Sequence, residues 1–208
     1  MIKVIVVDDH PVVRRGLKQI IEDEPDMEVV GEAKNAEECF SLVQKTDYTL
    51  VLLDITLPGR SGFDVLKQLK YEHPGLPVLI LSTHPEDLYG LRLIKAGASG
   101  YLMKEEAPEE LVKAIRKVSA GGKYVSASLA GKLVSHLGAF DKPPHENLSN
   151  REFQILCMIA QSKSLKSIAD ELCIGEKTVS SYRSRIMGKM KMSTNYDLIR
   201  YAVENHLV

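Results

Sequence analysis

The first 120 residues alternate between short apolar runs and amphipathic segments, five times in succession. The apolar runs are rich in Val, Leu and Ile and lie at 3–7, 27–33, 50–53, 77–81 and 100–103. Each is followed by a segment whose apolar residues recur at helical spacing, at 12–22, 37–44, 63–71, 88–96 and 109–119. Five strands, each followed by a helix, predict an α/β fold with a parallel sheet that helices cover on both faces.

The pattern changes near position 148, where only helical periodicity follows. Ser149 and Glu152 form an S-x-x-E capping box ahead of an apolar-periodic helix, and further short helices with small turns reach position 208. Small residues and a Pro-Pro pair between 121 and 147 are typical of a linker, in which 128–137 is expected to form a helix. We therefore predict an α/β domain over 1–120, a linker over 121–147 and a small all-α domain over 148–208.

Composition limits the kind of protein that this chain can be. It is 44% apolar and 26% charged, which is the normal range for a soluble globular protein. It contains no run of 18 apolar residues and no signal-peptide pattern, so no membrane span or export is expected. Cys39, Cys157 and Cys173 are widely spaced and odd in number, which indicates buried thiols in a reducing compartment such as the cytoplasm.

Three carboxylates, a hydroxyl and an ammonium group fall at the ends of predicted strands. Asp8 and Asp9 follow the first strand, Asp54 the third, Ser82 the fourth and Lys104 the fifth. In an open α/β sheet, groups at the carboxyl ends of strands gather at one edge. Adjacent carboxylates repel, and a hard divalent cation with oxygen ligands offsets that cost. The pattern predicts a Mg²⁺ site where a carboxylate attacks a phosphoryl group and Lys104 neutralises a phosphoryl oxygen.

Each of these residues also has a plainer interpretation. Two adjacent aspartates more often form a solvated loop, a single lysine usually lies on the surface, and Asp54 by itself is also compatible with a helix cap. The combination is more specific, because all of these groups lie at successive strand ends in the order D-D, D, S-T, K.

Residues 1 to about 120 resemble the receiver domain of bacterial response regulators, in the stretches VVDDH, LLDITLPGRSG, LILST and KAGASGYLMK. The resemblance implies a flavodoxin-like five-stranded parallel sheet. It also implies that Asp54 is the phosphoacceptor and that a histidine kinase is the phosphoryl donor. Asp8, Asp9, Asp54 and the backbone carbonyl of Thr56 would then bind Mg²⁺.

The same resemblance implies a phosphorylation switch. Lys104 would contact the phosphoryl group, and Ser82 would supply a switch hydroxyl in the place often held by Thr. Tyr101 resembles the aromatic residue that rotates inward on activation.

The stretch SLKSIADELCIGEKTVSSYRSRIMGKM has the pattern of a helix, a short turn at Gly175 and a second helix. Five basic and no acidic residues lie between 177 and 191, and 148–208 has a net charge of +3 against −4 for the remainder. A basic helix with short serine side chains suits a major groove, although charge alone fits a solvated helix of a protein-interaction domain equally well. The residues expected in the helix-turn-helix core are Ile168, Ala169, Leu172, Val179, Tyr182 and Ile186.

Residues 148–208 resemble the LuxR-type helix-turn-helix domain, in LSNREFQIL, IADELCIGEKTVSSYRSRIMGKMKM and DLIRYAVENHL. With the receiver, this resemblance covers essentially the whole chain and points to the NarL/FixJ class of response regulators. The residues that it leads us to expect at double-stranded DNA are Lys177, Ser180, Ser181, Arg183, Ser184, Arg185 and Lys189. A homodimer contact is expected on the last helix, where intradomain packing is the alternative, at Leu198, Ile199, Ala202 and Val203.

The expectation from sequence is a cytoplasmic, phosphorylation-regulated transcription regulator that is not an enzyme. Two alternatives stay open. The first is a Mg²⁺-dependent phosphohydrolase. Such enzymes usually need a second acidic group near the nucleophile, and the threonine at position 56 argues against this alternative. A constitutive DNA-binding regulator would use its receiver only for dimerisation. The sequence does not name the kinase, the operator or the sign of regulation.

Overall fold

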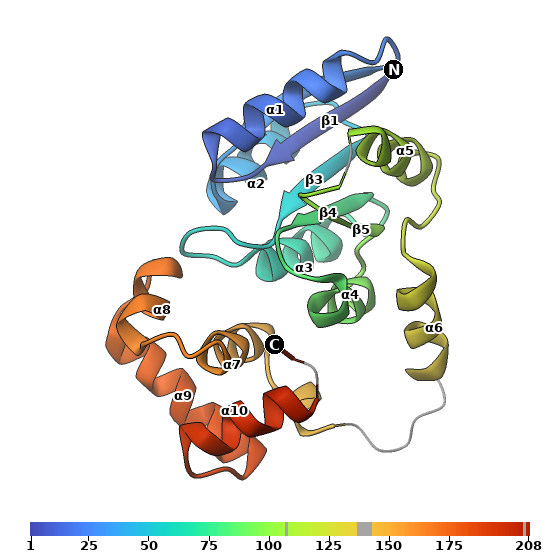
Figure 1. Ribbon diagram of the computed structural model, residues 1–208. Coiled ribbons are helices and arrows are strands. Elements are labelled where there is room, and N and C mark those ends of the chain that lie inside the picture. Colours follow the sequence, from blue (N-terminus) through green and yellow to red (C-terminus); the bar gives the residue numbers. More distant parts are fainter. Residues whose placement is uncertain (107, 137–142, 206) are drawn as a thin grey trace. The chain divides into compact units, whose positions relative to one another are not determined.

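The computed structural model describes residues 1–106, 108–136, 143–205 and 207–208, and it divides into two compact units, 1–133 and 134–208. The first unit alternates strands and helices as predicted (Figure 1). Its elements are β1 (Ile2–Val7), α1 (Pro11–Glu22), β2 (Met27–Ala33), α2 (Ala36–Lys45), β3 (Leu50–Asp54), α3 (Gly62–Glu72), β4 (Val78–Ser82), α4 (Glu86–Lys95), β5 (Gly100–Met103) and α5 (Pro108–Ser119). Helix α6 (Ala127–His136) begins in this unit and continues past its boundary at position 133.

The five strands form one parallel sheet in the order β2-β1-β3-β4-β5. This confirms the predicted sheet. The chain moves to one side of β1 to make β2 and to the other side to make β3, so the strand order reverses between β1 and β3. Ligands of open α/β sheets bind at such a reversal, beyond the carboxyl ends of the strands. The first, third and fourth strands therefore end around a common position.

Helices cover both faces of the sheet. On one face, Leu17 and Ile21 of α1 and Ile115 of α5 belong to one buried cluster with alternate strand residues such as Val4 and Leu52. Helices α2, α3 and α4 lie on the opposite side (Figure 1). Burial on both faces explains why the strands are continuous runs of Val, Leu and Ile instead of alternating polar and apolar residues.

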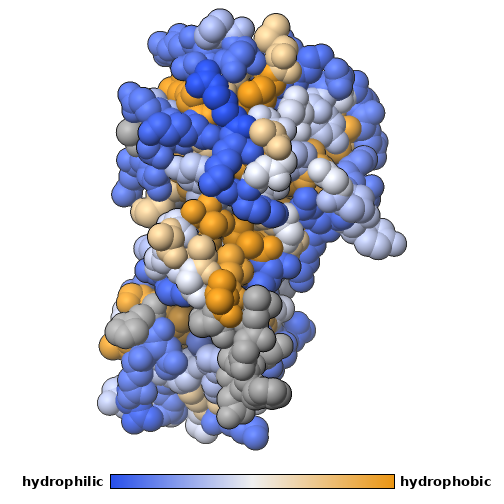
Figure 2. Space-filling model, turned by 90° about the vertical axis from the view of Figure 1, so that its right-hand side faces the viewer, coloured by the Kyte–Doolittle hydropathy of each residue, from blue (hydrophilic) through white to orange (hydrophobic). Residues whose placement is uncertain are grey.

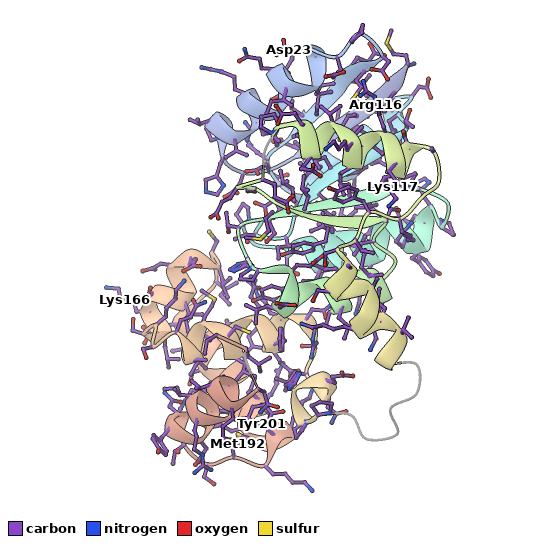
Figure 3. All side chains as sticks on the ribbon, turned by 45° about the vertical axis from the view of Figure 1, so that its right-hand side comes forward. Asp23, Arg116, Lys117, Lys166, Met192 and Tyr201 are labelled. Atoms are coloured by element: carbon purple, nitrogen blue, oxygen red, sulfur yellow. The ribbon has the colours of Figure 1, made fainter. Side chains whose placement is uncertain are left out.

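An ion-pair cluster ties α5 to the loop that follows α1. The guanidinium of Arg116 lies 2.6 Å from a carboxylate oxygen of Glu24 and 2.9 Å from one of Asp26. Figure 3 labels Arg116 on α5 and Asp23, the C-cap of α1. The contact joins residues about ninety positions apart and helps to hold the two helices of this face together.

The five helices that follow the strands begin one or two residues before the starts that apolar periodicity predicts, and α1 and α4 show the reasons. Helix α1 begins at Pro11 and α4 at Glu86, one and two residues before the predicted starts. Proline suits the first turn of a helix because its backbone lacks the N–H that would be unpaired there. In α4, Glu86 and Asp87 lie in the first turn, where negative side chains interact favourably with the positive end of the helix dipole. Neither signal is apolar, so periodicity alone misses both.

Part of the predicted linker is ordered structure. Helix α6 covers 127–136, close to the expected 128–137, whose last residue lies outside the described part of the chain. Before it, Tyr124 forms a parallel bridge with Gly100 of β5. The boundaries 1–120, 121–147 and 148–208 remain predictions.

The second unit is helical, as predicted. Its elements are η1 (Pro144–Asn147), α7 (Asn150–Ala160), α8 (Leu165–Glu171), α9 (Glu176–Met190) and α10 (Asn195–Glu204). The predicted capping box at Ser149 and Glu152 is confirmed, since each side chain accepts a backbone N–H of the other residue. None of the helices among the described residues is long and apolar enough to cross a membrane.

One expectation for the helix-turn-helix needed correction, whereas Gly175 lies in the turn as predicted. Cys173 is exposed and adopts a left-handed backbone with φ of 50° in the turn between α8 and α9, so the prediction of a buried thiol was wrong there. Cys39 and Cys157 are buried as predicted. Gly175 has an ordinary φ of −68° and is the N-cap of α9, so the turn does not depend on its conformational freedom.

Candidate functional site

The side chains predicted at the strand ends come together in the first unit. Asp54 ends β3 with 2% of its surface exposed, and Lys104 follows β5. The Lys104 ammonium lies 2.7 Å from Asp54 Oδ2 and 2.6 Å from Asp8 Oδ2. The backbone N–H of Thr56 donates to Asp54 Oδ1 at 3.0 Å. Both oxygens of the Asp54 carboxylate are thus oriented by donors.

The acidic pair after β1 differs in exposure and partners. Asp8 is 1% exposed, whereas the side chain of Asp9 is 32% exposed. The Nδ1 atom of His10 lies 2.9 Å from Asp9 Oδ1 and 3.2 Å from Asp8 Oδ1. Arg14 of α1 donates to the backbone carbonyl of Asp8 at 2.7 Å. Sequence reasoning missed His10 and Arg14, although both closely follow the acidic pair.

The charges of the pocket influence one another. Burial raises the pKa of Asp54, and the positive charge of Lys104 opposes this effect only in part. Burial lowers the pKa of Lys104, but the charges and hydrogen bonds of Asp54 and Asp8 outweigh burial and raise it overall. Lys104 therefore stays charged at neutral pH, beside the carboxylate that it orients.

Carboxylate oxygens of Asp8, Asp9 and Asp54 and a ring nitrogen of His10 all lie within 4.8 Å of one another. Three carboxylates share this position with one lysine, so a divalent cation would reduce the remaining repulsion. The donor set fits a hard cation, because most of its atoms are carboxylate oxygens. The carbonyl of Thr56 as a further ligand remains a prediction.

Ser82 and Tyr101 lie in a hydrogen-bonded chain next to the pocket. Ser82 is fully buried, and its Oγ accepts the backbone N–H of His84 at 3.0 Å. The Tyr101 hydroxyl donates to the carbonyl of His84 at 2.7 Å. Tyr101 is 3% exposed, so its ring points inward in this structure. Burial also raises the pKa of its hydroxyl, which keeps the proton that this bond needs.

Gly62 belongs to the site, although the sequence marks it only as part of the turn after the third strand. It begins α3, and its N–H donates to the carbonyl of Ile55 at 3.0 Å. A Cβ at position 62 would lie 2.3 Å from the backbone oxygen of Asp54 and 2.5 Å from Cα of Ile55. Only glycine permits this close approach of α3 to the end of β3.

In the second unit, α8 and α9 pack as the predicted helix-turn-helix. Ile168, Ala169, Leu172, Val179 and Ile186 are buried, which confirms them as core residues. Tyr182, also expected in the core, is only partly buried, and the guanidinium of Arg185 lies 5.6 Å from the centre of its ring.

The expected DNA-contacting side chains lie along α9. Lys177, Ser181, Ser184, Arg185 and Lys189 are exposed, whereas Ser180 and Arg183 are partly buried. Arg183 donates to the side chain of Asn195 at 2.6 Å, which ties α9 to α10. The five exposed residues recur every three to four positions, so their basic and hydroxyl groups lie along one face of α9. Contact with DNA remains a prediction for each residue.

Lys189 already has a partner in the domain. Its ammonium lies 2.7 Å from Oε2 of Glu152, whose side chain is 4% exposed. Burial opposes ionisation of Glu152, but hydrogen bonds from Lys189 and Ser149 outweigh it and hold the pKa below its ordinary value. The pair thus joins the capping box of α7 to the end of α9.

Replacing Glu152 by glutamine should destabilise the second unit at neutral pH by about 1 kcal/mol, because the variant keeps the cap but loses the charged pair. A depressed pKa stabilises the fold above the ordinary value of 4.5 and loses this effect as the pH falls through the lowered pKa. The difference from wild type should therefore vanish in acid. Hydrogen exchange of peptides from α7 and α9 in the full chain, against pH, measures it. The exposed Glu204→Gln is the control, and equal stability of both variants at pH 7 would contradict the assignment.

Only some of the residues of α10 that were expected at a dimer contact are accessible on its surface. Leu198 and Ala202 are fully buried within the domain, where α10 packs against α7. Ile199 is partly buried, and Val203 is 57% exposed. Intradomain packing therefore accounts for the first two, and a dimer contact would use the last two.

The two units match two families of known domains. The model of the response regulator receiver domain matches residues 4–116. The model of bacterial regulatory proteins of the luxR family matches residues 146–202. The chain belongs to the response-regulator family.

The match extends over nearly the full length of several relatives. The response regulator GacA of Pseudomonas aeruginosa is 38% identical over 212 residues, which cover 100% of this chain and 98% of GacA. The transcriptional regulatory protein LiaR of Bacillus subtilis is 36% identical and is covered completely, as is this chain. A solved structure of RcsB dimers bound to two parallel DNAs is 25% identical, with a TM-score of 0.60, and covers 97% of this chain and 98% of that one.

This response regulator therefore joins a phosphorylation input to a DNA-binding output in one chain. The receiver domain is the first unit, and the luxR-type domain is the helical second unit. The family consists of DNA-binding transcription regulators and not of classical enzymes. The pocket at the strand ends is the acidic site of the receiver.

Proposed function

We propose that Asp54 accepts a phosphoryl group from a sensor histidine kinase and that this modification controls DNA binding. The observation that carries the proposal is the contact of Lys104 with both Asp54 and Asp8 at the carboxyl end of the sheet. This geometry places a fixed positive charge beside a buried carboxylate, where transferred phosphoryl oxygens develop negative charge.

In the proposed step, an Asp54 carboxylate oxygen attacks phosphorus of a phosphohistidine. The new phosphorus–oxygen bond forms as the phosphorus–nitrogen bond breaks, and the electron pair of that bond stays on the histidine nitrogen, which takes up a proton. Lys104 then contacts a phosphoryl oxygen in place of Asp54 Oδ2. The N–H of Thr56 holds the other carboxylate oxygen throughout.

The resident cation is proposed to be Mg²⁺, held by Asp8, Asp9, Asp54 and the carbonyl of Thr56. When bound, it neutralises charge on the phosphoryl oxygens and on the carboxylates. His10 and Arg14 position the acidic pair through the contacts described above.

The modified Asp54 is expected to recruit Ser82, with Tyr101 and Lys104 as further parts of the switch. The bond from His84 to Ser82 must break when the hydroxyl turns toward the phosphoryl group. Such local changes bias a bistable element and alter a distant surface. The output is a cytoplasmic, homodimeric DNA-binding regulator with domain boundaries near 120 and 148.

The basic face of α9 is proposed to bind double-stranded DNA through phosphates and base edges. Arg185→Ala or Lys177→Ala should weaken operator binding about 3-fold to 10-fold and lower the slope of log K against log salt by about 0.9 each. Fluorescence anisotropy over a salt series measures both quantities. Lys67→Ala on α3 of the receiver is the matched control and should leave affinity and slope unchanged.

The operator for these measurements comes from selection of genomic fragments with the full chain, with and without a phosphodonor. Enrichment of a palindromic or directly repeated site is the expected result. Absence of any sequence preference would contradict the DNA-binding role. Equal affinity of wild type and Asp54→Ala with phosphodonor would favour a constitutive regulator instead.

A further inference from the structure

The segment after α5 is packed on the receiver. Tyr124 extends the edge of the sheet: its N–H donates to the carbonyl of Ser99 at 2.9 Å, and its carbonyl accepts the N–H of Tyr101 at 3.0 Å. Its hydroxyl donates to Glu110 of α5 at 2.6 Å. The ammonium of Lys117, labelled on α5 in Figure 3, lies 5.8 Å from the centre of its ring. The edge of β5 is therefore already occupied by the chain itself.

Helix α6 continues this packing onto α4. Ser126 caps α6 by accepting the N–H of Leu129 at 3.0 Å, and its hydroxyl and N–H both donate to the carboxylate of Glu86. Lys132 forms an ion pair with Asp87. Leu129 is 1% exposed, so it is the apolar anchor of the helix.

The receiver surface is shaped to accept this segment. A Cβ at Gly90 of α4 would lie 2.9 Å from Cδ2 of Leu129, and a Cβ at Gly100 would lie 2.6 Å from the carbonyl oxygen of Tyr124. Glycine at both positions allows the close approach. On another face of α6, Val134 is 70% exposed, and Figure 2 shows hydrophobic surface over this helix.

The contacts of the segment lead directly to the switch residues. Tyr101 holds Tyr124 through its backbone N–H and holds the carbonyl of His84 through its hydroxyl. The N–H of His84 in turn donates to Ser82. Glu86, which holds Ser126, lies two residues after His84. A movement of residues 82–86 therefore changes the support of Tyr124 and of α6 together.

We propose that residues 123–133 are an intramolecular ligand of the surface formed by α4, β5 and α5, and that phosphorylation of Asp54 weakens their docking. The inference rests on the proposed function of Asp54. A phosphoryl group attracts the Ser82 hydroxyl away from His84, residues 82–86 shift, and the contacts of Glu86 with Ser126 are lost. Release lengthens the tether to the DNA-binding domain, which widens the range of half-site spacings that a dimer reaches.

Hydrogen exchange of the full chain tests the docking first. Leu129→Ala should speed exchange of the amides in 123–133 about tenfold or more, because it removes the buried anchor. Val134→Ala changes an exposed valine of the same helix and should stay within about twofold of wild type. Gly90→Ala is a second variant that pushes against Leu129 from α4 and should speed exchange in the same segment. Unchanged exchange in both Leu129→Ala and Gly90→Ala would overturn the docking.

The coupling is tested in wild type by adding beryllium fluoride and Mg²⁺, which form a stable mimic of the phosphoryl group on an aspartate. We expect protection of peptides at 54–62, where the mimic binds, together with exchange of 123–133 that is about tenfold faster. Asp54→Ala should show neither effect. Protection of the pocket with unchanged or slower exchange in 123–133 would overturn the coupling and leave the role of Asp54 intact. Absence of protection in the pocket would overturn both.

Discussion

Replacing Asp54 by alanine should abolish incorporation of phosphoryl from a small phosphodonor such as acetyl phosphate. The wild-type chain with Mg²⁺ should gain a single phosphoryl group, and a chelator should prevent this gain. The reason is geometric: Asp54 is the carboxylate that Lys104 and the N–H of Thr56 orient at the end of β3. Intact-protein mass spectrometry after incubation measures the result directly.

The matched control is Asp47→Ala, which removes an aspartate whose side chain is 86% exposed and pairs with Lys3. It should accept phosphoryl as wild type does. Incorporation into Asp54→Ala at the wild-type level would refute the phosphoacceptor assignment. No incorporation into wild type would favour the constitutive regulator, or a receiver that accepts phosphoryl only from its own kinase.

The second large effect is expected from a methyl group at position 62. Gly62→Ala places a Cβ 2.3 Å from the backbone oxygen of Asp54, and backbone atoms on both sides have no flexible end that could give way. The start of α3 and the end of β3 must separate. We expect a loss of about 2–4 kcal/mol in stability and at least a hundredfold slower phosphorylation, because the nucleophile moves from its donors. Chemical denaturation and the time course of mass gain measure the two effects.

Gly16→Ala is the control for this substitution. Gly16 lies within α1, and a Cβ there would meet nothing within 4 Å. Alanine favours a helix interior over glycine, so the control should gain about 0.5–1 kcal/mol and phosphorylate normally. If Gly62→Ala behaved like this control, the close approach of α3 to Asp54 would be wrong.

The parallel sheet and the acidic pocket were predictable because each depends on a local pattern. A strand buried on both faces needs an uninterrupted apolar run, and each of the five runs ends where the chain turns back. Asp54 and Lys104 could be assigned to one edge without knowing any distance, because all parallel strands place their carboxyl ends on the same side. The capping box at Ser149 was predictable for the same reason, since its partner lies only three residues away.

Other features depend on partners that lie far away in the sequence. Lys189 was expected at DNA from the resemblance to the LuxR-type domain, yet its ammonium is held by Glu152, 37 positions earlier. Leu198 and Ala202 fit an exposed apolar stripe equally well until α10 is seen to pack on α7. Cys173 is exposed in a turn where its backbone is left-handed, and a cysteine does not predict such a conformation.

By itself, the sequence determined the two kinds of domain, the order of strands and helices, and the chemical groups at the strand ends. Periodicity and residue type act over a few neighbouring positions, so they can be read directly from the chain. Only the tertiary structure decided that Gly62 lies against Asp54, that His10 lies beside Asp9 and that Tyr124 completes the edge of β5. Those contacts depend on how whole helices and strands pack against one another. In a close-packed interior, a shift of one element by about an ångström changes which side chains are in contact.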